Sequence, residues 1–253
     1  MIVMLKLSKI VGEFMDKEII ITAKDIANRK KKYNNLKLIL SIIFIILILA
    51  FIILSVIYNG GKFTVTLDPA LALESGIVIY DDPEIKEGKR KLTAKNLEFM
   101  DNISIDWIPQ NIDNESNGTH NGENYIAYTF YIENQGKEVI NYWYSVVIDD
   151  VIKNVDEAAR VMIYLNGERS VYAKINSYTK EAEKDTKVFF SDEEAVLEQR
   201  RDFKPGDIDK FTVVIWLEGD DPDCVDSILG GEIKMHMEIR EEHKEQENGK
   251  EEK

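Results

Sequence analysis

The densest group of potential metal ligands in this chain is an acidic stretch near its C-terminal end. Residues 218–226 read EGDDPDCVD and place five carboxylates within nine positions. Calcium prefers carboxylate oxygens, and extracellular sites bind it with Kd values of about 10⁻⁴ to 10⁻³ M. The stretch is therefore a weak candidate for a calcium site made of Glu218, Asp220, Asp221, Asp223 and Asp226. The spacing is not that of an EF-hand, so a solvated acidic turn is the interpretation that we favour.

The side chains that most often carry catalysis are sparse and scattered. The chain has three histidines, His120, His236 and His243, and a single cysteine, Cys224. The sequence contains no H-E-x-x-H zinc motif and no G-x-S-x-G nucleophile motif. One cysteine excludes an intramolecular disulfide scaffold, so Cys224 is either a buried small side chain or half of an intermolecular disulfide. We therefore predict no catalytic residue, no cofactor and a protein that is not an enzyme.

The acidic stretch follows a segment with the apolar alternation of a β-strand. Apolar side chains occupy every second position in four segments, 125–133, 139–149, 211–217 and 233–239. A period of two is typical of a strand with one buried face. Between these segments, Asn166-Gly167 predicts a two-residue hairpin turn. We expect Ile163 and Val171 to lie on the buried face of that hairpin.

Further segments have weaker patterns. Shorter strands are expected at residues 62–67, 76–80 and 102–107, and the Asn- and Gly-rich residues 110–124 are expected to form a long exposed loop. Many short strands with one apolar face indicate two packed antiparallel sheets. The fold prediction is an all-β domain at residues 59–240, an antiparallel β-sandwich of immunoglobulin-like or jelly-roll type.

A different pattern precedes this domain. Residues 38–58 form a run of 21 positions without a charged side chain. A helix of this length is about 32 Å long, which matches the roughly 30 Å hydrocarbon core of a bilayer. We therefore predict one transmembrane helix at residues 38–58, with the lipid bilayer as its partner.

The charge distribution predicts the orientation of that helix. Residues 1–58 hold nine basic and four acidic residues, a net charge of +5, whereas residues 59–253 hold 23 basic and 42 acidic residues, a net charge of −19. The positive-inside rule then places residues 1–37 in the cytoplasm and the β-domain outside the cell. The acidic balance also argues against nucleic acid as a partner.

The two ends of the sequence contribute no further candidate site residues. Residues 241–253 are almost entirely charged and are expected to be a disordered tail. At the other end, both Met1 and Met15 are candidate translation starts, because Met15 opens the ordinary bacterial start Met-Asp-Lys-Glu.

Three segments of the β-domain resemble extracytoplasmic sandwich proteins of Gram-positive bacteria. They are the strand end at 131–136 (YIENQG), the turn Pro205-Gly206-Asp207, and residues 215–224 followed by Gly230-Gly231. Over about residues 125–240 the chain is distantly similar to the TasA/camelysin group of matrix-fibre proteins. The resemblance implies a membrane-anchored surface protein of a clostridium-like or bacillus-like cell. The long anchor differs from the cleavable signal of that group.

The expected function is that of a non-catalytic surface protein that binds a protein partner or a cell-envelope component, or supports surface structure. Two alternatives remain open at this stage. One is a camelysin-like surface protease, and the other is a sensor or accessory subunit of a membrane complex.

Overall fold

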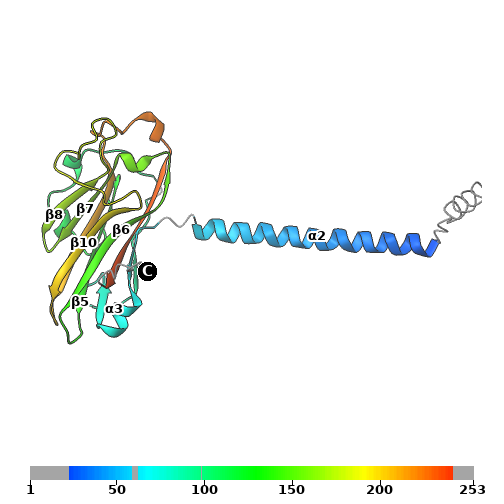
Figure 1. Ribbon diagram of the computed structural model, residues 1–253, viewed down its shortest axis with the longest axis horizontal. Coiled ribbons are helices and arrows are strands. Elements are labelled where there is room, and N and C mark those ends of the chain that lie inside the picture. Colours follow the sequence, from blue (N-terminus) through cyan, green and yellow to red (C-terminus); the bar gives the residue numbers. More distant parts are fainter. Residues whose placement is uncertain (1–22, 59–61, 98, 242–253) are drawn as a thin grey trace, which may run out of the picture. The chain divides into compact units, whose positions relative to one another are not determined.

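The computed structural model describes residues 23–58, 62–97 and 99–241, and the chain divides into two compact units after Gly60 (Figure 1). The candidate starts Met1 and Met15 and all but the first residue of the predicted tail lie outside the described residues. We describe the helical unit and the β-unit separately.

The helical unit contains one long α-helix, α2 (Ala23–Tyr58). An 18-residue window within residues 28–54 of this helix has a mean hydropathy of 3.2, and residues 28–54 are all exposed. A helix on the surface of a soluble protein has a polar face, whereas α2 is apolar on all sides along residues 38–58. The structure thus confirms one N-terminal helix that is long and apolar enough to cross a membrane. The helix begins well before the predicted span and includes the basic residues that precede it.

The β-unit consists of two sheets. The five-stranded sheet has the order β10 (Glu194–Phe203), β6 (Ile140–Ile152), β12 (Glu232–Glu241), β1 (Thr64–Leu67) and β3 (Lys91–Thr93). The seven-stranded sheet has the order β2 (Ile77–Tyr80), β5 (Tyr125–Asn134), β11 (Ile208–Leu217), β7 (Ala159–Leu165), β8 (Glu168–Ala173) and β9 (Lys187–Val188), with β4 (Gly118–Thr119) paired to β5. The short helix α3 (Pro69–Glu74) and the 3-10 turns η1 (Ile105–Trp107), η2 (Ile112–Asn114), η3 (Val155–Glu157) and η4 (Asp226–Ile228) connect the strands.

The main hydrophobic core lies between the two sheets. It contains the predicted apolar rows of β5, β6, β11 and β12, and the Tyr144 ring of one sheet meets the Phe211 ring of the other edge-on at 5.1 Å. Apolar burial of this kind is the main favourable term in folding. The structure therefore confirms an all-β sandwich with an N-terminal helix.

The Asn- and Gly-rich segment is not a simple exposed loop, contrary to the prediction for residues 110–124. Ile112 in η2 is fully buried, and β4 pairs with β5. Together with Ile103 and Ile108, Ile112 packs on the outer face of the seven-stranded sheet against Val214 and Trp216. The segment from about residue 101 to 119 thus covers a second apolar face, which the sheet needs because the outward side chains of β11 are also large and apolar.

Two other strand expectations need correction. Residues 102–107 were expected to form a strand, but only Ile103 makes a β-bridge, to Glu218, and the 3-10 turn η1 follows. The sheets are also not purely antiparallel, because β1 pairs with β12 and β8 pairs with β9 in parallel. A parallel pair needs a crossover connection that brings the chain back to the end of the sheet where the first strand began. The apolar alternation within one strand does not predict such a connection.

The hairpin at Asn166-Gly167 forms as predicted, but one of its two named core residues lies on the other face. Ile163 points into the main core and pairs with Ser170, whereas Val171 pairs with Met162 and belongs to the covered outer face. A two-residue turn pairs Leu165 with Glu168, so the partners that share a face with Ile163 have even numbers on β8. Tyr172, rather than Val171, therefore fills the main core.

Strand β10 was not predicted, because its inward row is charged. Glu198 and Arg200 pair in register with the inward residues Tyr144 and Tyr142. Glu198 accepts a hydrogen bond from the Tyr172 hydroxyl at 3.1 Å, and the Arg200 Nε donates to Asp209 at 3.0 Å. Inward charges and two register irregularities protect this edge strand from pairing with another chain.

Candidate functional site

A group of buried charges lies where β7 begins and β11 ends. Arg160, the second residue of β7, is 4% exposed and donates to the Asp221 carboxylate in the loop that follows β11. Its second contact is Glu183, whose Oε2 lies 4.0 Å from the Arg160 Nη2. Strand alternation places Arg160 on the face opposite Val161, away from the main core and toward these loops.

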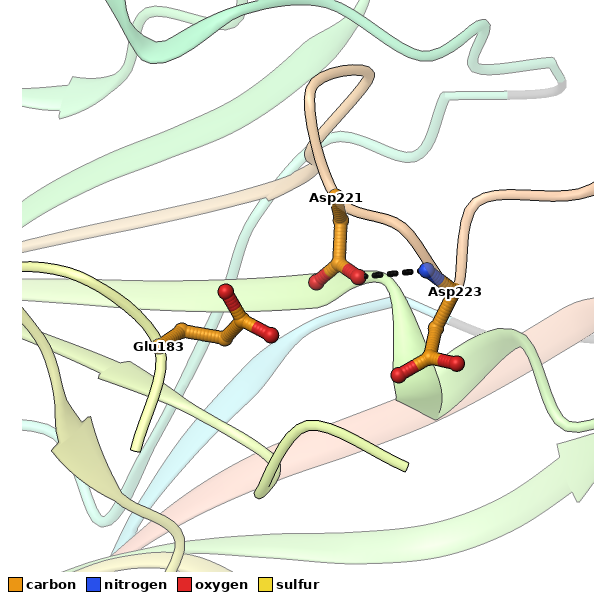
Figure 2. Close-up of side chains that lie close together, drawn as sticks. All are labelled: Glu183, Asp221 and Asp223. Carbon is orange, nitrogen blue, oxygen red and sulfur yellow. Dashed lines mark hydrogen bonds between the residues drawn. The ribbon is translucent and has the colours of Figure 1, made fainter. Parts of the chain in front are cut away.

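The carboxylates around Arg160 come from two loops. Oxygens of Glu183, Asp221 and Asp223 lie within 4.8 Å of one another. Figure 2 shows these three side chains close together. The backbone N–H of Asp223 donates to the Asp221 Oδ1 at 2.7 Å, so these two residues also form a tight local turn. We call Arg160, Glu183, Asp221 and Asp223 the Arg160 cluster.

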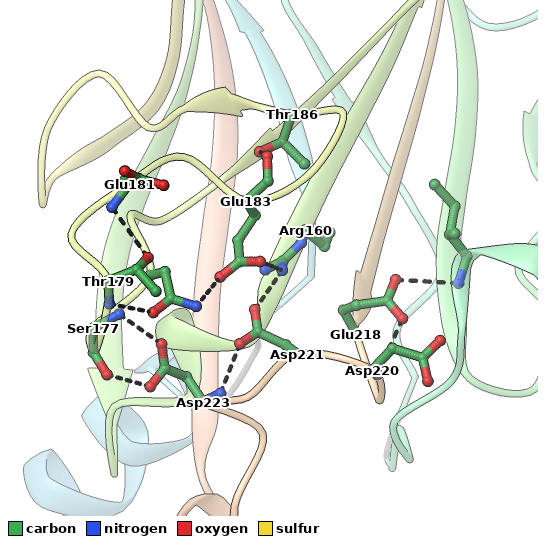
Figure 3. A network of polar contacts seen from close by, with 12 residues as sticks. Arg160, Ser177, Thr179, Glu181, Glu183, Thr186, Glu218, Asp220, Asp221 and Asp223 are labelled. Atoms are coloured by element: carbon green, nitrogen blue, oxygen red, sulfur yellow. Dashed lines mark hydrogen bonds and ion pairs between the residues drawn. The ribbon is translucent and has the colours of Figure 1, made fainter.

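Two of the three carboxylates of this cluster have a further partner outside it. Asp223 accepts hydrogen bonds from the backbone N–H of Ser177 at 2.9 Å and from the Ser177 hydroxyl. The Glu183 Oε1 accepts from the Asn176 amide at 2.7 Å (Figure 3). The Arg160 cluster therefore joins the loop that follows β8 to the loop that follows β11.

The five residues of the predicted calcium site do not converge on one point. Asp221 and Asp223 lie in the Arg160 cluster, whereas Glu218 and Asp220 lie apart from it in Figure 3. Glu218 accepts from the backbone N–H of Ile105 at 3.1 Å and from the Trp216 indole at 3.0 Å. Asp220 and Asp226 are exposed.

The arrangement favours an ion-pair network over a metal centre. The Arg160 guanidinium already supplies a positive charge beside Asp221 and Glu183, and a calcium ion at this point would compete with it. A site built on the five predicted residues would also require Glu218 and Asp223 to release their N–H donors. Calcium binding by this stretch stays a prediction, and the contacts assign its buried carboxylates a structural role.

A second cation, Lys174, forms ion pairs at the same end of the sandwich. Lys174, directly after β8, has its Nζ 2.6 Å from Asp156 and 3.1 Å from Glu157. Burial alone lowers the pKa of the Lys174 ammonium, but hydrogen bonds and charge interactions with Asp156 and Glu157 raise it above the usual value overall. Lys174 therefore stays charged and holds η3 against the end of β8.

Arg160, its partner Glu183 and the Asp223 partner Ser177 did not stand out in the sequence. No motif marks them, and they lie 35 or more residues before the acidic stretch they contact. Cys224, which did stand out, is a half-buried free thiol whose sulfur accepts a hydrogen bond from the Asn102 amide at 3.1 Å. It packs beside Val155, Ala158 and Ile228.

The two described histidines have structural partners. The ring nitrogens of His120 face the carbonyl oxygens of Gly118 and Ile112, at 3.0 and 3.2 Å. His236 lies on the outer face of the five-stranded sheet, with Nδ1 2.8 Å from Asp149 and Nε2 3.0 Å from Glu238. His243 lies outside the described residues. Both described imidazole rings are therefore held by hydrogen bonds to neighbouring residues.

We predict that His236 makes the stability of the β-unit depend on pH. Burial alone lowers the pKa of His236, but the hydrogen bonds and charges of Glu238 and Asp149 raise it above its usual value overall. Its contribution is therefore complete below about pH 6.5, the unfolded pKa, and disappears as the pH rises through the higher folded pKa. The contribution should not exceed about 1 kcal/mol, because these ion pairs are partly exposed.

Urea unfolding between pH 5 and 9 checks this expectation. Tryptophan fluorescence of the full chain is a suitable signal, because Trp107, Trp143 and Trp216 all lie in the β-unit. His236→Gln should remove part of the stability loss above about pH 6.5. An identical pH profile in wild type and His236→Gln would contradict the assigned pairing.

The loops joined by the Arg160 cluster expose apolar side chains. Tyr178 is 70% exposed next to Ser177, and Leu229 is 66% exposed at the end of η4. Val225 and Ile152 are also exposed, and the Lys153 ammonium, next to Ile152, donates to the Leu229 carbonyl at 2.6 Å.

Comparisons with known proteins do not assign the chain to a family. No family model matches it, and no curated protein matches it. One solved structure that aligns with it is a β-glucosidase from Kluyveromyces marxianus in complex with glucose, at 13% identity and a TM-score of 0.20. The alignment covers 64% of this chain and only 15% of the glucosidase, so the similarity carries no argument about fold or activity.

Proposed function

We propose that this protein is a single-pass membrane protein whose β-sandwich lies on the outer surface of the cell and has a non-catalytic binding or structural role. The observation that carries the proposal is the combination of a fully exposed apolar helix with a separate, self-contained β-unit. The main core of the sandwich is formed by residues of the β-unit, and residues 28–54 of α2 are all exposed. Lipid is the environment that such a helix requires.

The charge distribution supports the orientation. The net charge of +5 over residues 1–58 lies on the N-terminal side of the span, and the net charge of −19 lies on the other side. Basic residues near a span favour the cytoplasmic side, so the N-terminus is placed inside the cell and the sandwich outside. The resemblance to Gram-positive surface proteins agrees with this placement.

The binding role is assigned to the end of the sandwich where the Arg160 cluster joins the loops. Tyr178 and Leu229 on these loops are exposed, while the Arg160–Asp221 ion pair that joins the loops is buried. Buried ion pairs fix the loops in one geometry and leave the apolar side chains free to meet a partner. A preorganised surface of this kind loses little conformational entropy on binding.

Cysteine labelling of whole cells tests the topology. In a Cys224→Ala background, Lys137→Cys places a thiol on an exposed turn of the sandwich, and Lys30→Cys places one on the other side of the span. A membrane-impermeant maleimide should label Lys137→Cys in intact cells and Lys30→Cys only after permeabilisation. The reverse pattern, or equal protection of both sites in intact cells, would refute the proposed orientation.

A further inference from the structure

We infer that the basic part of helix α2, residues 24–37, binds the headgroups of anionic phospholipids and selects these lipids around the membrane span. This segment carries six basic side chains and a single acid, Asp25. The basic residues are Lys24, Arg29, Lys30, Lys31, Lys32 and Lys37. From Arg29 onward these side chains are exposed.

The first argument is the continuity of the helix. The basic segment and the apolar run belong to one uninterrupted helix, Ala23–Tyr58. With a rise of about 1.5 Å per residue, Lys37 lies about 1.5 Å and residues 29–32 lie about 9–14 Å along the axis from Leu38. The headgroup layer extends about 5–8 Å beyond the hydrocarbon. Long Lys and Arg stems, and a Debye length of about 8–10 Å, bring all these charges within range of lipid phosphates.

The second argument is the distribution of charge around the axis. Successive residues of an α-helix are rotated by about 100°, so the four residues 29–32 cover about 300° of the circumference. A protein partner contacts one side of a helix, whereas lipids surround it. The Lys37 ammonium also lies 4.6 Å from the centre of the Tyr33 ring, an aromatic suited to the headgroup region. The arrangement therefore fits an annulus of anionic lipid.

Lipid selectivity of the full-length protein tests the inference. The protein is reconstituted into phosphatidylcholine vesicles that contain trace phosphatidylglycerol or phosphatidylcholine with a nitroxide on the acyl chain. Electron paramagnetic resonance then gives the relative association of each lipid with the protein. We expect a preference for phosphatidylglycerol of about fivefold at low salt, the factor that corresponds to about 1 kcal/mol. High salt should reduce it, because the Debye length at 1 M is about 3 Å.

Two variants with the same loss of charge provide the comparison. The first neutralises the basic segment of α2 and should lower the preference to near one: Arg29→Gln/Lys30→Gln/Lys31→Gln/Lys32→Gln/Lys37→Gln. The second neutralises five exposed lysines of the β-unit and should keep the preference: Lys95→Gln/Lys137→Gln/Lys180→Gln/Lys184→Gln/Lys204→Gln. A preference that is absent in wild type, or that falls equally in both variants, would overturn the inference.

The inference rests on the proposed membrane span but not on its orientation. Flotation of the vesicles separates the two. If the full-length protein does not float with the vesicles, the membrane span itself is refuted, and lipid selection by this helix falls with it. If the protein floats but shows no preference for phosphatidylglycerol, the span stands and only the lipid inference is wrong.

Discussion

Replacement of Ile163 by aspartate is expected to destabilise the β-unit by about 4 kcal/mol or more. Ile163 is 2% exposed in the main core, on a strand with neighbours on both sides, β11 and β8. The substitution removes a buried apolar side chain and places a carboxylate among the apolar side chains of the main core. Because small domains are stable by about 5–15 kcal/mol, the variant should be largely unfolded at moderate urea concentration.

Urea unfolding of the full chain, followed by tryptophan fluorescence, measures this effect. Ile163→Leu preserves the volume and should cost less than about 1.5 kcal/mol. Glu168→Lys, at the exposed turn of the same hairpin, should stay within about 0.5 kcal/mol of wild type. Comparable losses in Ile163→Asp and Glu168→Lys would show that the hairpin register is wrong.

Replacement of Arg160 by methionine is expected to cost about 3–5 kcal/mol, because it leaves buried carboxylates without their cation. The side chain of Asp221 is 1% exposed, and Glu183 lies beside it. Methionine fills a similar length of chain, so the effect reports the loss of charge rather than of volume.

A double variant separates the stability contribution of the Arg160–Asp221 ion pair from other effects of the Arg160→Met substitution. Asp221→Asn keeps an oxygen for the backbone N–H of Asp223 but removes the charge, so Arg160→Met/Asp221→Asn should recover more than half of the lost stability. Arg169→Met makes the same replacement at an exposed position and should change stability by less than about 0.5 kcal/mol. A loss below about 1 kcal/mol in Arg160→Met would mean that the pair is not desolvated.

Features that depend on residues close together in the chain were predictable from the sequence. The apolar run at residues 38–58 predicted a helix long enough to cross a membrane, and the structure contains it within α2. The alternating rows of β5, β6, β11 and β12 gave the main core, because a strand exposes successive side chains on opposite faces. The turn Asn166-Gly167 gave the hairpin, since it accepts the required positive φ values.

The same hairpin shows that apolar alternation and turn geometry must be used together to predict which face of a sheet a residue occupies. Apolar alternation alone placed Val171 in the main core, whereas the two-residue turn fixes Ser170 and Tyr172 on that face. Val171 is nevertheless buried, because residues of the segment 101–119 cover the opposite face of the sheet. That cover comes from a distant part of the chain, so a single strand gives no signal of it.

Partners that meet across long sequence separations were decided by the tertiary structure alone. The acidic stretch 218–226 contains no basic residue, which made a calcium ion a reasonable counter-charge. Folding instead brings Arg160 from β7 to Asp221 and Ser177 from another loop to Asp223. Likewise, the charged side chains of β10 have their hydrogen-bond partners, Asp209 and Tyr172, on other strands, so β10 could not be predicted from its own sequence. The physical reason is common to all these cases: a charge can be buried only with its partner, and the fold chooses that partner.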